Sequence, residues 1–286
     1  MQTVNRIAEL REAVDELRAG GGTLALVPTM GALHEGHLAL VREAGRRADS
    51  VVVSIFVNPT QFGPNEDLDA YPRRLAEDQA LLEAEGVRLL WAPGVEDMYP
   101  RGFATSVRVS GVNEPLEGTS RPGHLDGVAT VVLKLFEQVC PDIALFGEKD
   151  WQQLAVIRRM ARDLDLTRPR TDAILGVPTV RETDGLALSS RNAYLSPDER
   201  ARAAALSREM EAAIAAIEAG EDVTLALEKL EVDLIDAGFA SIDYAALADA
   251  VSLAALHETQ HAPMRLLVAA RIGGTRLIDN MPVGEG

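Results

Sequence analysis

The chain alternates between short apolar runs and longer segments whose apolar residues recur every three or four positions. Runs such as Thr23–Val27 and Ser50–Val57 are apolar and rich in β-branched residues, which is typical of strands buried on both faces of a parallel sheet. Asn5–Ala19 and Leu38–Ala48 have helical spacing, and Gly20–Gly22 ends the first of these helices. This alternation predicts a parallel sheet with right-handed crossovers.

The same alternation continues to about residue 175. It predicts helices over 73–85, 125–139 and 150–164, and strands over 87–91 and 142–146. The intervening segment 93–122 holds several Gly and Pro residues, so we expect it to be irregular, with a loop or a short strand around Thr105–Val109.

The pattern changes after Val177–Pro178. Two Ala-rich helices are predicted over 197–219 and 224–237, followed by short strands over 242–246 and 265–270 and a loosely held tail over 273–286. We therefore predict an α/β protein with a Rossmann-like parallel-sheet domain over residues 1–175. A smaller α+β C-terminal domain is predicted over residues 176–286.

Composition and charge limit the class of protein and its expected location. The 286 residues are 47% hydrophobic and 25% charged, which is ordinary for a soluble protein, and the formal net charge is −16. That charge argues against general affinity for nucleic acid or for an anionic membrane. The single Cys140 excludes an internal disulfide, the N-terminus has no apolar signal core, and no apolar run reaches membrane-spanning length. We expect a cytoplasmic protein.

One turn carries the clearest candidate chemistry. Residues Pro28–Leu38 lie between a predicted strand and a predicted helix, and Gly31 and Gly36 let a ligand approach the backbone closely. The first turn of a helix offers unpaired N–H groups and a positive dipole end, which suit a phosphate. His34 and His37 are three residues apart, so both reach one phosphate if the helix begins there. Alternatively, the two histidines are half of a metal site or have a structural role in capping the helix.

Three further polar clusters stand at predicted strand ends or near the domain junction: Asn58–Gln61, Gly147–Gln153 and Leu188–Asn192. Carboxyl ends of strands are where ligands bind in doubly wound sheets. Read alone, each cluster is also compatible with solvated surface positions, because isolated Gln, Glu, Lys and Asp residues are usually exposed.

Taken together and in this order, the clusters resemble the pantothenate synthetase family, a branch of the nucleotidyltransferase superfamily whose signature is His-x-Gly-His. The matching motifs are Pro28–Leu38, Phe56-Val57-Asn58-Pro59-x-Gln61-Phe62, Arg121-Pro122-Gly123-His124, Gly147-Glu148-Lys149-Asp150 and Asp184-Gly185-Leu186-x-x-Ser189-Ser190-Arg191-Asn192. They run from Pro28 to Asn192, about two-thirds of the chain. The last third matches only in its helix-rich character.

The resemblance implies a ligase that joins pantoate to β-alanine with ATP, through an enzyme-bound pantoyl adenylate and without a covalent enzyme intermediate. It implies ATP and Mg²⁺ as co-substrate and cofactor, a homodimer, and a lid role for the C-terminal domain. The residues that it marks as catalytic are His34, His37, Lys149, Ser189, Ser190 and Arg191.

The resemblance also implies binding roles. The residues that it assigns to ATP binding are Pro28, Thr29, Met30, His34, Gly36, His37, Gly147, Glu148, Lys149, Asp150, Val180, Leu188, Ser189, Ser190 and Arg191. Contacts to pantoate and β-alanine fall to Gln61, Gln153, Met30, Asn58 and Phe56. A lysine that some relatives carry two places before the first serine is Ala187 here, so the positive charge near the phosphates rests on Arg191 and Lys149.

Some roles stay open at this point. Glu77 and Asp78 are candidate partners for Mg²⁺, although helix carboxylates are usually just solvated. Arg121 and His124 either order a substrate loop or touch substrate directly. Two other functions share the His-x-Gly-His turn: a transferase that adenylylates a phosphorylated small molecule, and a non-catalytic module that senses ATP. The acidic balance and the short chain argue against a tRNA synthetase.

Overall fold

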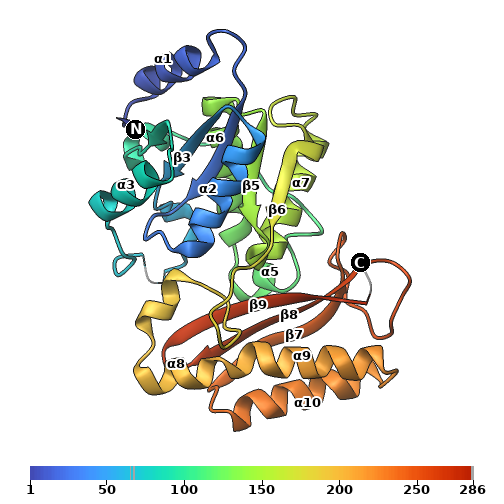
Figure 1. Ribbon diagram of the computed structural model, residues 1–286. Coiled ribbons are helices and arrows are strands. Elements are labelled where there is room, and N and C mark those ends of the chain that lie inside the picture. The colour runs from blue at the N-terminus through green and yellow to red at the C-terminus, as the bar shows by residue number, and fades with distance from the viewer. Residues whose placement is uncertain (65, 67, 285–286) are drawn as a thin grey trace. The chain divides into compact units, whose positions relative to one another are not determined.

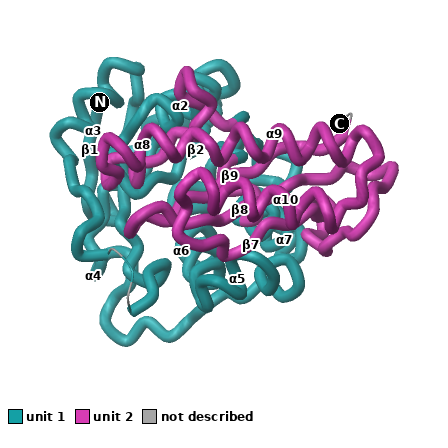
Figure 2. Tube along the Cα trace, turned by 90° about the horizontal axis from the view of Figure 1, so that it is seen from below, with its two compact units in different colours: residues 1–148, 153–178 teal, residues 149–152, 179–286 magenta. Residues whose placement is uncertain are grey.

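The computed structural model describes residues 1–64, 66 and 68–284 (Figure 1). Contacts divide the chain into two compact units, one of residues 1–148 and 153–178, the other of residues 149–152 together with the chain from 179 onward (Figure 2). The predicted boundary between residues 175 and 176 falls inside strand β6 (Ile174–Val177), which pairs with its neighbour along its whole length. The two domain ranges and the lid role stay predictions.

The first unit is built on a six-stranded sheet in the order β1-β4-β3-β2-β5-β6, and every pair of neighbours is parallel. Its strands are β1 (Gln2–Val4), β2 (Leu24–Thr29), β3 (Ser50–Ile55), β4 (Leu89–Trp91), β5 (Ile143–Gly147) and β6 (Ile174–Val177). The predicted Rossmann-like parallel sheet is confirmed. The short outer strands β1 and β6 were not predicted, because three or four residues are too few to show a period.

Helices lie on both faces of this sheet (Figure 1). The helices of this unit are α1 (Ile7–Arg18), α2 (Glu35–Arg47), α3 (Leu75–Ala84), α4 (Val95–Met98), α5 (Glu117–Ser120), α6 (His124–Val139) and α7 (Trp151–Asp163), which starts in the second unit. On one face, Ala25 and Val27 of β2 share an apolar cluster with Leu40 of α2 and Leu82 of α3. The alternate residues of β2 point to the opposite face, where α6 packs.

The segment Thr105–Val109 forms no strand. It is a loop, and the Val107 N–H donates to Thr130 Oγ1 on α6 at 2.9 Å. The hydroxyl of Thr130 on the helix thus accepts the backbone N–H that a neighbouring strand would otherwise bind. The short-strand alternative is therefore wrong.

The second unit is an antiparallel sheet in the order β7-β8-β9, with its helices on one face. Its elements are α8 (Pro197–Ala203), α9 (Ala205–Glu218), α10 (Val223–Asp236), β7 (Ser241–Asp249), β8 (Met264–Ile272) and β9 (Thr275–Val283). The smaller α+β domain type is confirmed. The helix predicted over 197–219 is divided into two at Ala204.

The predicted loose tail is wrong. Residues Thr275–Val283 form β9, which pairs with β8 from Met264↔Val283 to Ile272↔Thr275. Gly273 has φ +52°, which suits the tight hairpin between the two strands. Residues 285 and 286 of that tail lie outside the described residues.

Candidate active site

Three predicted site segments follow adjacent strands of the first unit. The His-x-Gly-His turn follows the central strand β2, Asn58–Gln61 follows β3, and Gly147–Glu148 closes β5. Because β3 and β5 flank β2 and run parallel to it, these segments meet at one edge of the sheet. The chain passes from β2 outward to β3 on one side and later to β5 on the other, which makes this edge the topological switch point.

The turn after β2 shapes the histidine pair. Helix α2 begins at Glu35, three residues earlier than predicted, with His34 as its N-cap. The Gly36 N–H donates to His34 Nδ1 at 3.2 Å, and the His34 N–H donates to His37 Nδ1 at 3.3 Å. The two rings lie 4.1 Å apart between centroids. Since each Nδ1 accepts a hydrogen bond, each neutral ring carries its proton on Nε2, which becomes a donor.

A buried carboxylate fixes the turn from the side. Asp78 on α3 is 2% exposed, and its two oxygens accept the N–H groups of Ala32 at 2.9 Å and Leu33 at 2.8 Å. The backbone there is unusual, because Gly31 and Ala32 both have positive φ, +84° and +51°. A Cβ at Gly31 would lie 3.0 Å from Asp78 Oδ2. Asp78 therefore stabilises the conformation that presents His34.

A chain of hydrogen bonds sets the orientation of the Gln61 amide. Asn58 Oδ1 accepts the Thr60 N–H at 3.2 Å, and Asn58 Nδ2 donates to the Gly127 carbonyl at 3.2 Å. An N–H only donates and a carbonyl only accepts, so the Asn58 amide has one orientation. Its Nδ2 also donates to Gln61 Oε1 at 3.0 Å. Gln61, which is 8% exposed, is therefore left with Nε2 as its donor end.

The Arg121 and His124 motif holds the backbone of Gln61. His124 Nδ1 lies 2.8 Å from the Gln61 carbonyl, and Arg121 Nη2 donates to the same oxygen at 3.3 Å. Arg121 also lies 3.0 Å from His124 Nε2 and makes a two-point ion pair with Glu66. Since Arg121 can only donate, His124 Nε2 accepts and Nδ1 donates. The structure thus favours loop ordering for both residues.

The charges of this cluster shift two pKa values. Burial, together with the adjacent Arg121 cation, lowers the pKa of His124 from 6.5 to about 4. Burial alone would raise the pKa of Glu66, but the hydrogen bonds and charge of Arg121 hold it below its usual range. His124 is therefore neutral at physiological pH and Glu66 is ionised.

The other predicted residues of this unit lie around the same strand ends. Thr29 Oγ1 donates to the Ser54 carbonyl and accepts the Gly31 N–H, and the Phe56 N–H donates to the Thr29 carbonyl. Pro28 and Met30 are half-buried beside Thr29, and Gln153 is half-buried on α7. Glu148 lies against β6, where a Cβ at Gly176 would come within 2.9 Å of its side chain.

The remaining predicted residues belong to the second unit: Lys149, Asp150, Val180, Leu188, Ser189, Ser190 and Arg191. Residues 180–188 form a tight hairpin, closed by the Leu188 N–H on the Val180 carbonyl at 2.9 Å. Ser189 Oγ then accepts the Arg191 N–H at 3.3 Å and caps a short 3₁₀ helix over Ser190–Tyr194. The hairpin thus presents two serines and an arginine in a defined turn.

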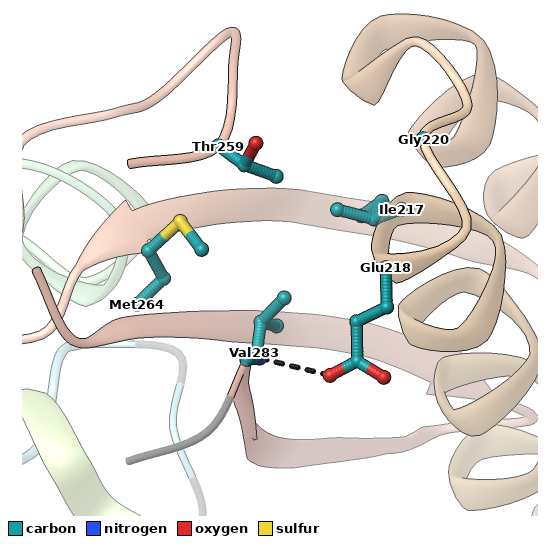
Figure 3. Close-up of a pocket in the computed structure, with 7 residues that line it drawn as sticks. Ile217, Glu218, Gly220, Thr259, Met264 and Val283 are labelled. Atoms are coloured by element: carbon teal, nitrogen blue, oxygen red, sulfur yellow. Dashed lines mark hydrogen bonds between the residues drawn. The ribbon is translucent and has the colours of Figure 1, made fainter. Parts of the chain in front are cut away.

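A cavity of about 510 Å³ opens elsewhere in the second unit. Figure 3 shows Glu218 at the end of α9 beside the end of β9, and Glu218 accepts the Gly284 N–H at 2.8 Å. No predicted site residue is among the described residues that line this cavity, and the ionisable group among them is the Glu218 carboxylate. An acidic, largely apolar cavity does not suit a triphosphate, so the candidate active site of the first unit remains the set of strand-end segments described above.

Comparison with known proteins decides the family. The family model described as pantoate-beta-alanine ligase matches residues 2–282. Curated relatives named pantothenate synthetase include one from Novosphingobium aromaticivorans, 69% identical over 99% of both chains, and one from Sphingopyxis alaskensis, 61% identical over 99% of this chain and 100% of the relative. The chain belongs to the pantoate–β-alanine ligase family.

Solved structures agree with this assignment. Pantothenate synthetase from Thermus thermophilus is 50% identical, with a TM-score of 0.91 over 98% of this chain and 99% of that one. Pantoate-beta-alanine ligase from Francisella tularensis, complexed with β,γ-ATP and β-alanine, is 34% identical, with a TM-score of 0.81 over 98% and 97%. The similarity to ligase structures therefore extends over both units. It includes the last third of the chain, where no sequence motif matched the family.

The described residues form no ready cluster of ligands for the magnesium ion that the family resemblance implies. No cluster of three or more His, Cys, Asp or Glu side chains that suits a metal occurs among residues 1–64, 66 and 68–284. Both oxygens of Asp78 accept backbone N–H groups, and Glu77 is exposed beside Arg74 at 3.6 Å. These contacts favour Asp78 as a turn anchor over its predicted role as a metal ligand. Across the same described stretches, no helix is long and apolar enough to span a bilayer.

Asp78→Asn is expected to lower stability by about 2 kcal/mol, because an amide NH₂ would then face a backbone N–H. The rate of pantoate-dependent ATP–pyrophosphate exchange should fall roughly tenfold or more, since the turn that carries both histidines shifts. Glu77→Gln, the same charge change one residue earlier on an exposed side chain, should leave both unchanged. Loss of Mg²⁺ affinity in both variants at normal stability would instead support a metal role.

The buried His124 gives a pH-dependent stability. Its pKa falls from 6.5 in the unfolded chain to about 4 in the folded one, so the unfolded state binds more protons between these pH values. Stability is therefore full above pH 6.5 and is lost as pH falls toward 4. This group alone accounts for roughly 3 kcal/mol of that loss.

His124→Asn keeps a donor at the Nδ1 position and cannot be protonated, so its unfolding free energy should fall less steeply from pH 7 to pH 4 than that of the wild type. Urea unfolding at several pH values measures this slope. His257→Asn, at an exposed imidazole, is the matched control. A His124→Asn slope equal to that of the wild type would contradict the buried, neutral state.

Sequence reasoning missed the anchoring groups. Asp78 is one turn before the buried Leu82 on α3, and an acidic residue on the apolar face of a helix is a readable signal for a buried partner. Tyr99 was also missed, although its hydroxyl donates to Asn58 Oδ1 at 2.9 Å. Its loop has no periodic pattern, so nothing in the sequence points to that contact.

Proposed function

We propose that this protein condenses (R)-pantoate with β-alanine, consuming ATP and releasing pantothenate, AMP and pyrophosphate through an enzyme-bound pantoyl adenylate. The family match over residues 2–282 supports the reaction. The single observation that carries the proposal is the Gln61 donor end. It lies in the short turn after β3, the strand next to β2 and its histidine turn, so a phosphate site and an acid-binding donor are adjacent.

In the first half-reaction a pantoate carboxylate oxygen attacks the α-phosphorus of ATP and pyrophosphate leaves. Two anions must meet, so donors and cations aimed at the phosphate oxygens lower the barrier most. His34 and His37 donate from Nε2, and the N-terminal N–H groups of α2 add a positive dipole end. The family resemblance assigns further charge and donors for the leaving pyrophosphate to Lys149, Ser189, Ser190 and Arg191.

Gln61 and Gln153 hold the acid in line. The Gln61 amide offers Nε2 to a pantoate hydroxyl or carboxylate, while Asn58 keeps Oε1 occupied. Phe56 is buried, and its backbone N–H donates to the Thr29 carbonyl. Oriented reactants convert a bimolecular encounter into an effectively unimolecular step. In the second half-reaction the neutral amine of β-alanine attacks the acyl carbon and AMP leaves, which forms the amide bond.

Several parts of the proposal extend beyond the geometry. Mg²⁺ would accompany the triphosphate, keep most of its water ligands and offset phosphate charge. The described residues form no dedicated cage for it, so every step above is assigned to the chain's own side chains. A homodimer is a further prediction of the family resemblance. A cytoplasmic location and a lid role for residues 176–286 are further predictions from the sequence.

ATP–pyrophosphate exchange tests the function. Pantoate alone should drive exchange of labelled pyrophosphate into ATP, and added β-alanine should then yield equal amounts of AMP and pantothenate. Exchange that needs a phosphorylated acceptor would instead favour a nucleotidyltransferase. ATP binding without any turnover would favour a nucleotide-sensing module.

A further inference from the structure

The last strand of the second unit carries two buried polar residues that the reaction above does not use. Asp279 and Asn280 are 2% and 3% exposed in the middle of β9, opposite Val268 and Leu267 of β8. Neighbouring residues on a strand point to opposite faces. A buried acid and a buried amide side by side are costly unless each has a partner.

Asn280 holds the backbone of Lys149. Its Nδ2 donates to the Lys149 carbonyl at 2.7 Å, and its Oδ1 accepts Arg265 Nε at 2.6 Å. The Arg265 guanidinium also stacks over the Trp151 ring, 3.6 Å from its centroid, and Trp151 Nε1 donates to the Ala250 carbonyl at 2.8 Å. The segment that bears Lys149 is thus fixed to the sheet at two points.

Asp279 holds the 180–188 hairpin, which leads into Ser189 and Ser190. Its carboxylate receives Arg181 Nη1 at 2.6 Å and Arg181 Nη2 at 3.0 Å, and its side chain is fully buried. Arg181 Nη1 also donates to the Gly185 carbonyl at 3.0 Å, which ties down the turn of the hairpin. The Asn280 N–H donates to Asp279 Oδ1 at 2.8 Å and joins the two arms.

We propose that Asp279 and Asn280 are positioning residues for the nucleotide phosphates, acting through Lys149 on one face of β9 and, on the other, through the 180–188 hairpin that leads into Ser189–Arg191. The inference rests on the proposed function, because it takes Lys149 and the hairpin to contact phosphate. The two proposed phosphate-binding segments lie more than thirty residues apart in the sequence. Both are then held by the same strand, β9, rather than by a loop. A bidentate ion pair and charge-assisted hydrogen bonds suit that task.

The test separates the two half-reactions. Asn280→Asp keeps the acceptor for Arg265 and loses the donor to the Lys149 carbonyl. Pantoate-dependent exchange should fall about 100-fold in kcat, the scale of a misplacement of roughly 1 Å. Attack of β-alanine on preformed pantoyl adenylate should stay within about threefold, because pyrophosphate has already left. Thr275→Val, buried on the same strand, is the control and should leave both unchanged.

A second comparison asks whether the effect passes through Lys149. In a Lys149→Ala background, Asn280→Asp should add less than about a further threefold loss, since residues that act as a unit are not additive. Equal loss in both half-reactions, or a full 100-fold loss in that background, would overturn the proposal. If Asn280→Asp does not fold, Asn280→Ser, which adds no charge, takes its place. Absence of pantoate-dependent exchange in the wild type would instead refute the proposed function.

Discussion

Replacing His37 with alanine is expected to leave the fold intact and to slow pantoate-dependent adenylation by roughly two to four orders of magnitude. The ring is oriented before substrate binds, because its Nδ1 accepts the His34 N–H at 3.3 Å. Its Nε2 proton is then a donor already aimed by the protein, which costs no reorganisation when charge builds on the α-phosphate.

The stability cost of this change should be small. Alanine removes the hydrogen bond that His37 Nδ1 accepts from the His34 N–H at the start of α2, and such a bond is worth about 1 kcal/mol. His37→Gln should recover part of the exchange rate, since a glutamine Nε2 overlays the imidazole Nε2 and donates. His257→Ala, at an exposed histidine, is the control. Exchange near the wild-type rate in a folded His37→Ala protein would show that this imidazole does not serve the transition state.

Gln61→Glu should lower kcat/KM for pantoate by about 100- to 1,000-fold while KM for ATP changes little. The substitution preserves size and keeps an oxygen for Asn58 Nδ2, but it replaces the donor end with a second oxygen. That oxygen meets the pantoate carboxylate as a like charge.

Gln79→Glu makes the same change at a half-buried glutamine of the same unit, whose amide donates to Thr3 Oγ1 at 3.1 Å, and should leave pantoate kinetics unchanged. Initial rates over a range of pantoate concentrations measure the effect. Parallel losses for pantoate and ATP in Gln61→Glu would place Gln61 outside the acid site.

The parallel sheet and the histidine turn were predictable from sequence because each has a local signal. Continuous apolar runs such as Ser50–Val57 mark strands covered on both faces, and glycines beside His34 and His37 mark a strand–turn–helix junction. Helix α2 begins at Glu35 in the structure, whereas the sequence predicted a start at Leu38. Helix ends depend on cap geometry, which the spacing of apolar residues does not report.

The strand β9 was missed because its stability is not local. Residues 275–283 include Arg276, Asp279, Asn280 and Pro282, which are poor strand formers, so composition predicts a loose tail. The fold accommodates Asp279 because its partner Arg181 lies 98 positions earlier in the chain. The turn contacts of Asp78 were not predicted for the same reason, since the N–H groups that it binds are 45 and 46 positions away. Sequence spacing cannot reveal such pairs.

The fate of a pantoate carboxylate oxygen tests the central claim, that the acid is activated as an adenylate at the histidine turn. The protein would be given pantoate labelled with ¹⁸O in its carboxylate, together with ATP and β-alanine, and the products would be analysed by mass spectrometry. One labelled oxygen should appear in the phosphate of each AMP, because that oxygen attacks the α-phosphorus and leaves with AMP when the amide forms. AMP without label, or label in pyrophosphate or inorganic phosphate, would contradict the account.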